Sequence, residues 1–155
     1  MIFSDTWTNA LLLIHLASCL FMTGVIWYVQ IVVYPQLRNV PEDFFAGYYS
    51  THTLRTGFIV GPPMLVELVS GSALLLIYST RSASGISPFL IAFLPLLLIW
   101  LSTLFLQIPL HAKLEKQRDA CVIEKLIKGN WIRTILWSFR SLWLMYLLFP
   151  ILKPF

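Results

Sequence analysis

Four long apolar segments recur along the 155-residue chain, and they constrain its fold more than any other feature. Each has about the 20 residues that a helix needs to cross the hydrocarbon core of a bilayer. The predicted spans cover residues 8–34, 56–78, 88–110 and 131–149. With 58% hydrophobic and 12% charged residues, the composition is far from that of a water-soluble globule. We therefore predict an all-α fold in which residues 1–155 form one integral membrane domain, a four-transmembrane-helix bundle.

Two of the connections between these segments have an amphipathic pattern. Residues 41–52 place aromatic side chains and His52 on one helical face, opposite acidic and hydroxyl residues. Residues 113–128 alternate Lys and Arg with Leu, Val and Ile. Such patterns are typical of helices that lie in the headgroup region of a membrane. We therefore predict short amphipathic interfacial helices in the first and third connections.

Basic residues are distributed unequally between the two predicted membrane faces. An even number of spans places both termini and the middle connection on one face, and the first and third connections on the other. The first and third connections hold Arg38, Arg55, Lys113, Lys116, Arg118, Lys125, Lys128 and Arg133, whereas the opposite face holds Arg81 and Lys153. The positive-inside rule predicts that the first and third connections are cytoplasmic and both termini lie outside the cell inner membrane. The net charge of +4 is thereby assigned to lipid headgroups rather than to nucleic acid.

Polar residues inside the spans lie in stripes. Such residues are costly in hydrocarbon and normally face a bundle interior or a wet cavity. The stripes, with spacings of three and four, are Trp27, Gln30 and Tyr34 in the first span, Trp100, Thr103, Gln107 and His111 in the third, and Asn130, Arg133, Trp137 and Arg140 in the fourth. Residues at this spacing share one helical face. We predict that the stripes face one shared interior.

Two charged residues lie at comparable depth in different spans. Glu67 is 12 residues beyond Arg55, or roughly 18 Å along a helix, which places it near the middle of the membrane. Arg140 lies within the fourth span. Either charge left alone in a medium of low dielectric would cost several kcal/mol. We predict that Glu67 pairs with Arg140, either as a clip that fixes helix register or as part of a reaction.

The remaining polar residues predict a pocket near the cytoplasmic ends of the spans. The candidate catalytic residues are His52, His111, Arg55, Arg133 and Glu67; the histidines would carry protons or bind a ligand, and the arginines would stabilise developing negative charge. The candidate cofactor-binding residues are Gln30, Tyr34, Gln107, Asn130, Trp137 and Arg140. His52 and His111 are also the candidate ligands for a metal or haem, although no HxxxH or ExxH spacing accompanies them.

Smaller residues and one further histidine have structural interpretations. His15 lies one helical turn before Cys19, away from the Gln30 stripe, and is expected to pack with a local hydrogen bond. Gly57, Gly61 and Gly71 are expected to allow close approach of helices.

Several segments together resemble a family of small, uncharacterised four-span bacterial integral membrane proteins. They are WYVQIVVYP from Trp27, HTLR from His52, PPMLVE ending at Glu67, LQIPLH ending at His111, and NWIRTILWSFR from Asn130 to Arg140. The layout is more remotely similar to anthrone-oxygenase-like four-helix membrane proteins. Their third span ends in a comparable proline-containing motif, with Asn where His111 stands in this chain.

Three hypotheses for function arise from these patterns. The leading one is an oxidoreductase- or oxygenase-like enzyme, or a binding protein of the same build, that admits a hydrophobic planar molecule such as a quinone from the bilayer. The second is a small proton-coupled transporter in which Glu67 titrates and Arg140 is its exchangeable partner. The third is an accessory subunit whose polar residues only hold helices together. Self-association into a homo-oligomer is compatible with all three.

Overall fold

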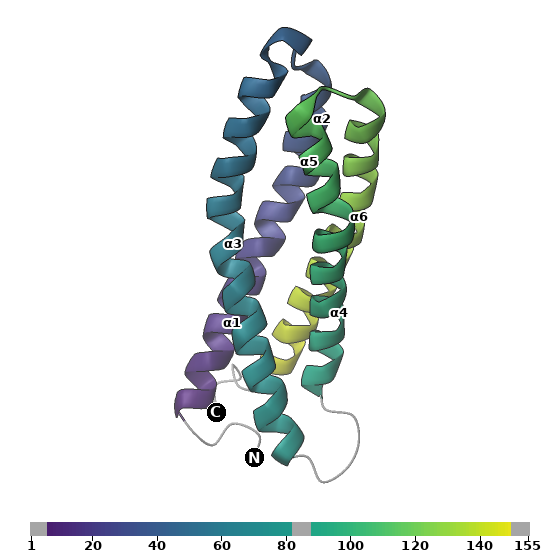
Figure 1. Ribbon diagram of the computed structural model, residues 1–155. Coiled ribbons are helices and arrows are strands. Elements are labelled where there is room, and N and C mark those ends of the chain that lie inside the picture. Colours follow the sequence, from purple (N-terminus) through teal and green to yellow (C-terminus); the bar gives the residue numbers. More distant parts are fainter. Residues whose placement is uncertain (1–5, 82–87, 150–155) are drawn as a thin grey trace.

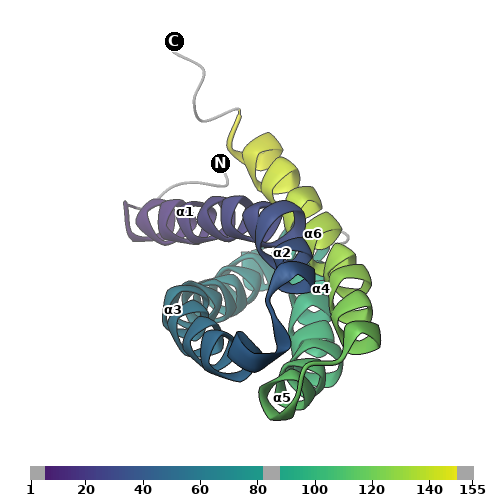
Figure 2. The same cartoon turned by 90° about the horizontal axis from the view of Figure 1, so that it is seen from above.

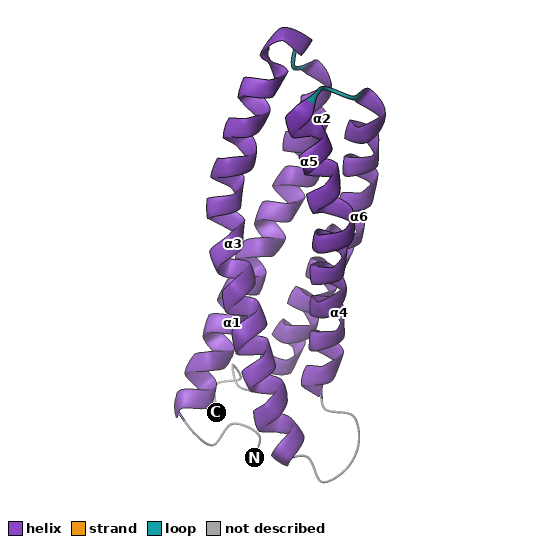
Figure 3. Ribbon diagram, in the orientation of Figure 1, coloured by secondary structure: helices purple, strands orange, loops and turns teal. Residues whose placement is uncertain are grey.

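The computed structural model describes residues 6–81 and 88–149 of the chain. Within these ranges the chain is helical except for short turns at 40–41 and 117–119 and the last residue, Phe149 (Figure 3). No strand is present in this part of the molecule. The all-α prediction is confirmed.

The helices form four rods (Figure 1). The first rod is α1 (Thr6–Tyr28), the π-helical turn η1 (Val29–Val33), α2 (Tyr34–Gln36) and the 3₁₀ turn η2 (Leu37–Asn39). The second is α3 (Glu42–Arg81). The third is α4 (Pro88–Ser102), the π-helical turn η3 (Thr103–Gln107) and α5 (Ile108–Lys116), and the fourth is α6 (Ala120–Leu148). The turns at 40–41 and 117–119 lie at the same end, which we call the connection end.

The rods are arranged around a common centre (Figure 2). α1 packs against α3 and α6, and α4 also packs against α3 and α6. α3 and α6 therefore lie diagonally opposite each other, and so do α1 and α4. At the connection end, a cluster of buried residues closes the bundle: Val29, Tyr34, Leu37, Phe45, Tyr49, Leu114, Val122, Ile123, Leu126 and Ile127.

Three rods are long and apolar enough to cross a membrane: Thr6–Asn39, Glu42–Ser79 and Pro88–Lys116. Length and composition thus confirm a helical membrane protein in general terms. The fourth rod, α6, is long enough, but its mean hydropathy is too low for it to be grouped with these three. Arg133 and Arg140 lower its mean hydropathy, and both side chains are buried inside the bundle.

The predicted interfacial helix at 41–52 is not a separate element. α3 begins at Glu42 and continues without a break through His52 to Arg81. No proline separates residues 42 and 61, so nothing in the sequence forces a bend there. Phe45 and Tyr49, which we expected to contact lipid, are fully buried against the other rods. Tertiary packing therefore extends the second rod by about four turns before the predicted start at residue 56.

The predicted amphipathic helix at 113–128 is divided between two rods. α5 ends at Lys116, the chain turns, and α6 begins at Ala120. The carboxylate of Asp119 caps α6 by accepting hydrogen bonds from the backbone N–H groups of Cys121 and Val122 (2.8 and 3.1 Å). The apolar residues of this segment line the inside of the connection end, which leaves the lysines outside.

Both π-helical turns precede a proline. Pro35 follows η1 and Pro109 follows η3, and in each case the carbonyl four residues before the proline lies within the turn. Proline has no N–H for that carbonyl and its ring clashes with it, so the helix widens locally. The Tyr34 N–H bonds to Val29 O and the Ile108 N–H to Thr103 O, five residues back in each rod. These turns change the helical phase beside Gln30 and Gln107, and π-turns often occur at functional sites.

Candidate functional site: a lateral cavity with a polar end

A cavity of about 490 Å³ lies between the rods, and all four contribute to its wall. This volume is within the range of sites that bind small molecules. Much of the wall is apolar, with Met22 and Ile26 from α1 and Val60 and Met64 from α3. Trp100 and Trp137 add two indole rings. Such a wall suits an apolar ligand that has flat surfaces.

Two glycines make room for the cavity. Gly57 and Gly61 both line it, and a Cβ added at either position would meet no atom within 4 Å. The expectation that they allow close helix approach is therefore wrong for these two positions. It is right for Gly71, where a Cβ would lie 3.0 Å from His15 Cε1 and 3.2 Å from Leu96 Cδ2.

The cavity reaches the surface on one side of the bundle. Its exposed lining residues all belong to α3 or α5: Gly57, Leu65, Ile108, Ala112 and Glu115. Phe58 follows the lining residue Gly57 in the sequence, and Phe105 lies three residues before the lining residue Ile108. These two phenylalanines are 74% and 71% exposed. The opening is thus lateral and largely apolar.

His111 lies at the polar end of the cavity between two tyrosines. Its Nε2 is 3.0 Å from the Tyr34 hydroxyl and its Nδ1 is 2.7 Å from the Tyr49 hydroxyl. Tyr34 lines the cavity, whereas Tyr49 is fully buried in the cluster that closes the connection end. The three side chains bring α2, α3 and α5 together.

The tautomer of His111 decides what Tyr34 offers to the cavity. If Nδ1 carries the proton, it donates to Tyr49 and the Tyr34 hydroxyl donates to Nε2. If Nε2 carries the proton, it donates to the Tyr34 oxygen, and Tyr49 donates to Nδ1. In that second arrangement the hydroxyl proton of Tyr34 is free to point to a ligand.

A second set of hydrogen bonds supports Arg133 from behind. The Gln30 side chain donates to Ile127 O (3.2 Å) and accepts from Asn130 Nδ2 (2.8 Å). Asn130 Oδ1 then accepts from Arg133 Nε (3.0 Å). Arg133 Nη2 also donates to the Tyr34 hydroxyl (3.3 Å). The guanidinium is therefore held in place on one side while it lines the cavity on the other.

Arg133 is not neutralised by a carboxylate. The residue is only 8% exposed, and none of the ion pairs between described residues includes it. Its Nη1 has no hydrogen-bond partner among those residues. A buried cation normally has a partner of opposite charge. The polar end thus presents an uncompensated positive charge to the cavity.

Two further polar groups at the cavity are unpartnered within the described structure. Gln107 is 1% exposed, and neither its amide nitrogen nor its amide oxygen has a hydrogen-bond partner. The indole N–H of Trp100 is also buried without one. A Cβ at Gly129 would lie 3.2 Å from the Gln107 nitrogen, so glycine leaves space for the amide. Buried polar groups without partners are rare and indicate a missing ligand, ion or water.

The predicted pairing of Glu67 with Arg140 is confirmed, and it belongs to a different cluster. Arg140 Nη1 donates to Glu67 Oε2 and both side chains are fully buried. Trp137 Nε1 donates to the same carboxylate (3.1 and 3.2 Å). Arg140 also bonds to Ala92 O (3.1 Å) and to His15 Nε2 (3.3 Å). This pair is enclosed and does not line the cavity.

The structure brings seven of the eleven predicted site residues together at the cavity and leaves four outside it: His52, Arg55, Glu67 and Arg140. Tyr34, Gln107, His111, Arg133 and Trp137 line the cavity, and Gln30 and Asn130 support Arg133 from behind. Trp27 points outward and donates to Ser138 Oγ (2.9 Å), because η1 shifts the phase of the first stripe. Arg55 is exposed on α3, and His52 stacks on Tyr48 (6.3 Å between ring centroids) without lining the cavity.

Sequence reasoning missed Tyr49 and the role of His15. Tyr49 lies four residues after Phe45 and three before His52, so the three residues share a helical face. This spacing indicates burial against other helices as much as contact with lipid. His15 bonds to Ser70 Oγ on α3 (2.7 Å) as well as to Arg140. Its hydrogen bonds are therefore between rods, and the expectation of a local bond is wrong.

The donor set for a metal is small. Among the described residues, no group of three or more His, Cys, Asp or Glu side chains is placed to hold a metal ion. Both ring nitrogens of His111 are already within hydrogen-bond distance of tyrosine hydroxyls. His52 Nε2 is buried without a partner, away from the cavity wall.

Comparisons with known proteins identify no relative of this chain. No protein-family model, no curated protein and no solved structure matches it. Its function must therefore be inferred from the geometry of its own residues.

Proposed function

We propose that α6 is a fourth membrane span and that the protein is a four-span bundle. From residue 131 to its end, the large exposed side chains of α6 are apolar or aromatic: Trp131, Ile132, Ile135, Phe139, Leu142, Met145 and Tyr146. Its two arginines face inward, where they do not meet lipid. A helix with this division of residues suits a bilayer although its mean hydropathy is lower than that of the other rods.

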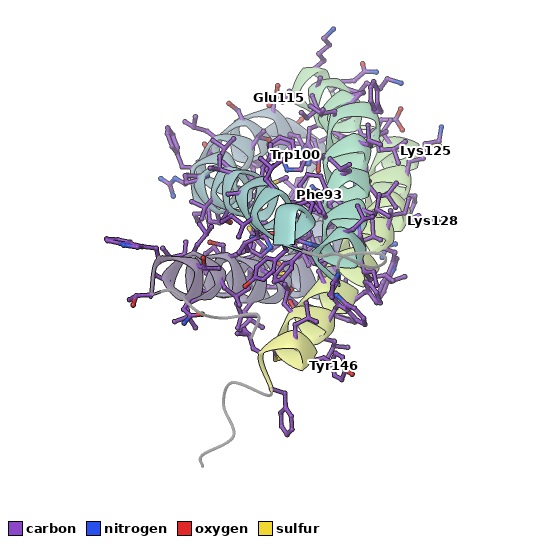
Figure 4. All side chains as sticks on the ribbon, turned by 90° about the horizontal axis from the view of Figure 1, so that it is seen from below. Phe93, Trp100, Glu115, Lys125, Lys128 and Tyr146 are labelled. Atoms are coloured by element: carbon purple, nitrogen blue, oxygen red, sulfur yellow. The ribbon has the colours of Figure 1, made fainter. Side chains whose placement is uncertain are left out.

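We propose that the connection end faces the cytoplasm. Lys113, Lys116, Lys125 and Lys128 are exposed there. Figure 4 shows Lys125 and Lys128 directed away from the bundle. Arg133 is buried and therefore does not add to the positive charge exposed at this end. Without it, the connection end still has more exposed basic residues than the predicted opposite face, which holds Arg81 and Lys153. Exposed lysines near a membrane surface favour the cytoplasmic leaflet.

We propose that the protein binds a hydrophobic, planar small molecule, such as a quinone or a polycyclic aromatic, that enters from the bilayer. The observation that carries this proposal is the cavity of about 490 Å³ with a largely apolar wall, a lateral opening and unpartnered polar groups on its lining residues. An apolar pocket with a few convergent polar groups is the usual form of a ligand site.

Binding is the part of the enzyme hypothesis that the geometry supports best. Tyr34 and His111 are placed to donate or accept a proton at the polar end. An oxidoreductase or oxygenase would also need an electron donor or acceptor, which the chain's own side chains do not supply. The proposed activity is therefore ligand binding, with proton transfer available if a redox partner joins the site.

Tryptophan fluorescence tests the proposed binding site. Trp100 and Trp137 line the cavity, so a quinone bound there should quench them. Decylubiquinone added to the purified protein in detergent is expected to give saturable quenching. The substitution Gly61→Leu, which fills open space in the wall, should abolish the saturable part. Gly24→Leu is the matched control, because Gly24 is an exposed helical glycine with no atom near its Cβ position and does not line the cavity. Equal quenching of all three proteins would contradict the proposal.

The same preparations separate the alternatives. A proton-coupled transporter would show substrate flux in vesicles that Glu67→Gln abolishes. An accessory subunit would lose thermal stability in Arg140→Leu and would show no saturable quenching in any variant.

A further inference from the structure

We infer that the ligand carries an oxyanion on its apolar body, either a carboxylate or an acidic enol or phenol, and that Arg133 binds it at the polar end of the cavity. This inference rests on the proposed function and specifies the chemistry of the ligand at the same site. Four features of the cavity support it.

The first feature is the state of the Arg133 guanidinium. It is buried, lines the cavity and has no carboxylate partner among the described residues. Asn130 and Tyr34 occupy its Nε and Nη2, and Nη1 is left without a partner in that part of the chain. A guanidinium in this state is suited to an oxyanion, because arginine is always charged and its hydrogen bonds to anionic oxygens are the strong kind.

The second feature is the character of the neighbouring groups. The Trp100 indole is a donor only, and it is unpartnered within the described residues. The Gln107 side chain is almost fully buried and likewise unpartnered, and its nitrogen supplies two donors. Tyr34 offers a further hydroxyl donor in one of the two His111 tautomers. The Gln107 oxygen is an unpartnered acceptor among the same described residues. Donors nevertheless outnumber acceptors among the unpartnered groups of the lining residues, as they do where an enzyme or carrier holds a negative oxygen.

The third feature is the overall charge of the cavity wall. Glu115 is its only acidic residue in the described part of the chain, and its side chain is exposed at the opening. Water or headgroups screen a charge in that position, whereas they do not screen a buried guanidinium to the same degree. The inner end of the cavity is thus positive.

The fourth feature is the contrast with the apolar wall. An inorganic anion would satisfy Arg133 but leave the rest of the cavity, from Met22 to Met64, unfilled. An apolar body bearing one oxyanion fills both parts. A planar hydroxyquinone and a fatty acid share this chemistry, and matched probes distinguish them.

Two matched probe pairs test the inference. One pair is an alkyl hydroxynaphthoquinone, which is an acid, and its neutral O-methyl ether. The other is a dibrominated stearate, which quenches tryptophan at short range, and its methyl ester. Each pair differs in the anionic oxygen but shares the apolar body, and each is titrated against tryptophan fluorescence at a pH where the acid is ionised.

The expected result is that at least one acid binds about tenfold or more tightly than its neutral partner, because hydrogen bonds to charged groups are stronger by that order. Arg133→Gln should reduce the ratio of acid to neutral affinity to about one, and cooperative thermal unfolding of the variant in detergent shows that it is folded. Arg133→Lys should restore part of the preference. Preference for the hydroxyquinone acid identifies a planar ligand, and preference for the stearate identifies a fatty acid.

Three results would overturn the inference. In the first, acid and neutral forms bind equally and Gly61→Leu abolishes both, which leaves the proposed function standing. In the second, the acid is preferred but Arg133→Gln keeps the preference, so another group holds the anion. In the third, no probe quenches saturably, which contradicts the proposed function as well.

Discussion

Arg133 and Arg140 lie seven residues apart on α6, and the surroundings of these two buried arginines differ in every respect that matters for function. Arg140 is fully enclosed and has Glu67, His15 and the Ala92 carbonyl as partners. Arg133 lines a cavity and has no acidic partner among the described residues. One helix therefore carries an arginine whose charge is paired and, two turns away, an arginine whose charge is not paired within the described structure.

The difference indicates how a small membrane protein separates stability from binding. The enclosed cluster joins all four rods, because Glu67, His15 and Arg140 come from α3, α1 and α6, and Arg140 also donates to Ala92 O on α4. The open cluster keeps donors free toward the cavity. Trp137 connects the two, since its N–H bonds to Glu67 while the residue also lines the cavity.

The largest expected effect comes from breaking the enclosed cluster. Arg140→Leu leaves the Glu67 carboxylate buried without its cation, and removing one partner of a buried pair costs about 3–5 kcal/mol. Unfolding of the purified protein in detergent measures the loss. The double variant with Glu67→Leu should recover most of it, because replacing both partners by apolar residues is often close to neutral. A single variant as stable as wild type would contradict this account of the cluster.

A smaller effect distinguishes the glycines of the two regions. Gly71→Ala places a methyl group 3.0 Å from His15 Cε1, and hydrogen bonds to Ser70 and Arg140 prevent that ring from moving aside. The expected destabilisation is about 1–3 kcal/mol. Gly61→Ala meets open space in a helix and should instead stabilise by about 0.5–1 kcal/mol. Thermal unfolding of both variants checks the signs. Destabilisation by Gly61→Ala would show that the cavity wall is packed there, and stabilisation by Gly71→Ala would contradict the close contact with His15.

Two glutamines sharpen the comparison further. Gln30→Leu removes the partner of Asn130 Nδ2 and is expected to cost about 1–2 kcal/mol of stability. Gln107→Leu removes an amide that has no partner in the described structure, so its stability should be unchanged or slightly higher. Equal losses in thermal unfolding would mean that Gln107 has a structural partner and is not free for a ligand.

The smallest effect concerns the connection end. Arg38 donates two hydrogen bonds to Glu124 (2.6 and 2.9 Å), and they hold the pKa of Glu124 below its ordinary value of 4.5. Because the pKa of Glu124 is lowered in the folded state, the ion pair stabilises the fold at pH values above the ordinary pKa of 4.5. This contribution is lost as the pH falls through the folded-state pKa. The melting temperature of wild type should therefore fall slightly more than that of Glu124→Gln when the buffer is acidified below pH 4.5. Parallel curves for the two proteins would show that this exposed pair contributes nothing.

Helical spacing was sufficient to predict directions within the rods. It placed Gln107 and His111 on one inward face, and Arg133 and Arg140 on another. The pairing of Glu67 with Arg140 followed from charge and depth alone. These features depend on properties that a single helix carries in its own sequence.

Other features depend on packing between rods and could not be predicted. The burial of Tyr49 requires that α3 begin well before residue 56, where the predicted span starts. The outward turn of Trp27 follows from the π-helical turn η1, whose extra residue shifts the 3.6-residue periodicity. The cavity itself depends on the distance between helix axes beside Gly57 and Gly61, which a stripe of residues on one helix does not fix.

Mass spectrometry of the small molecules that co-purify with the protein in native lipid particles tests the central claim most directly. Wild type and Gly24→Leu are expected to retain the same hydrophobic molecule, and Gly61→Leu, which fills the cavity wall, is expected to lose it. Identical sets of molecules in all three samples would show that the cavity, which opens between α3 and α5, holds no ligand.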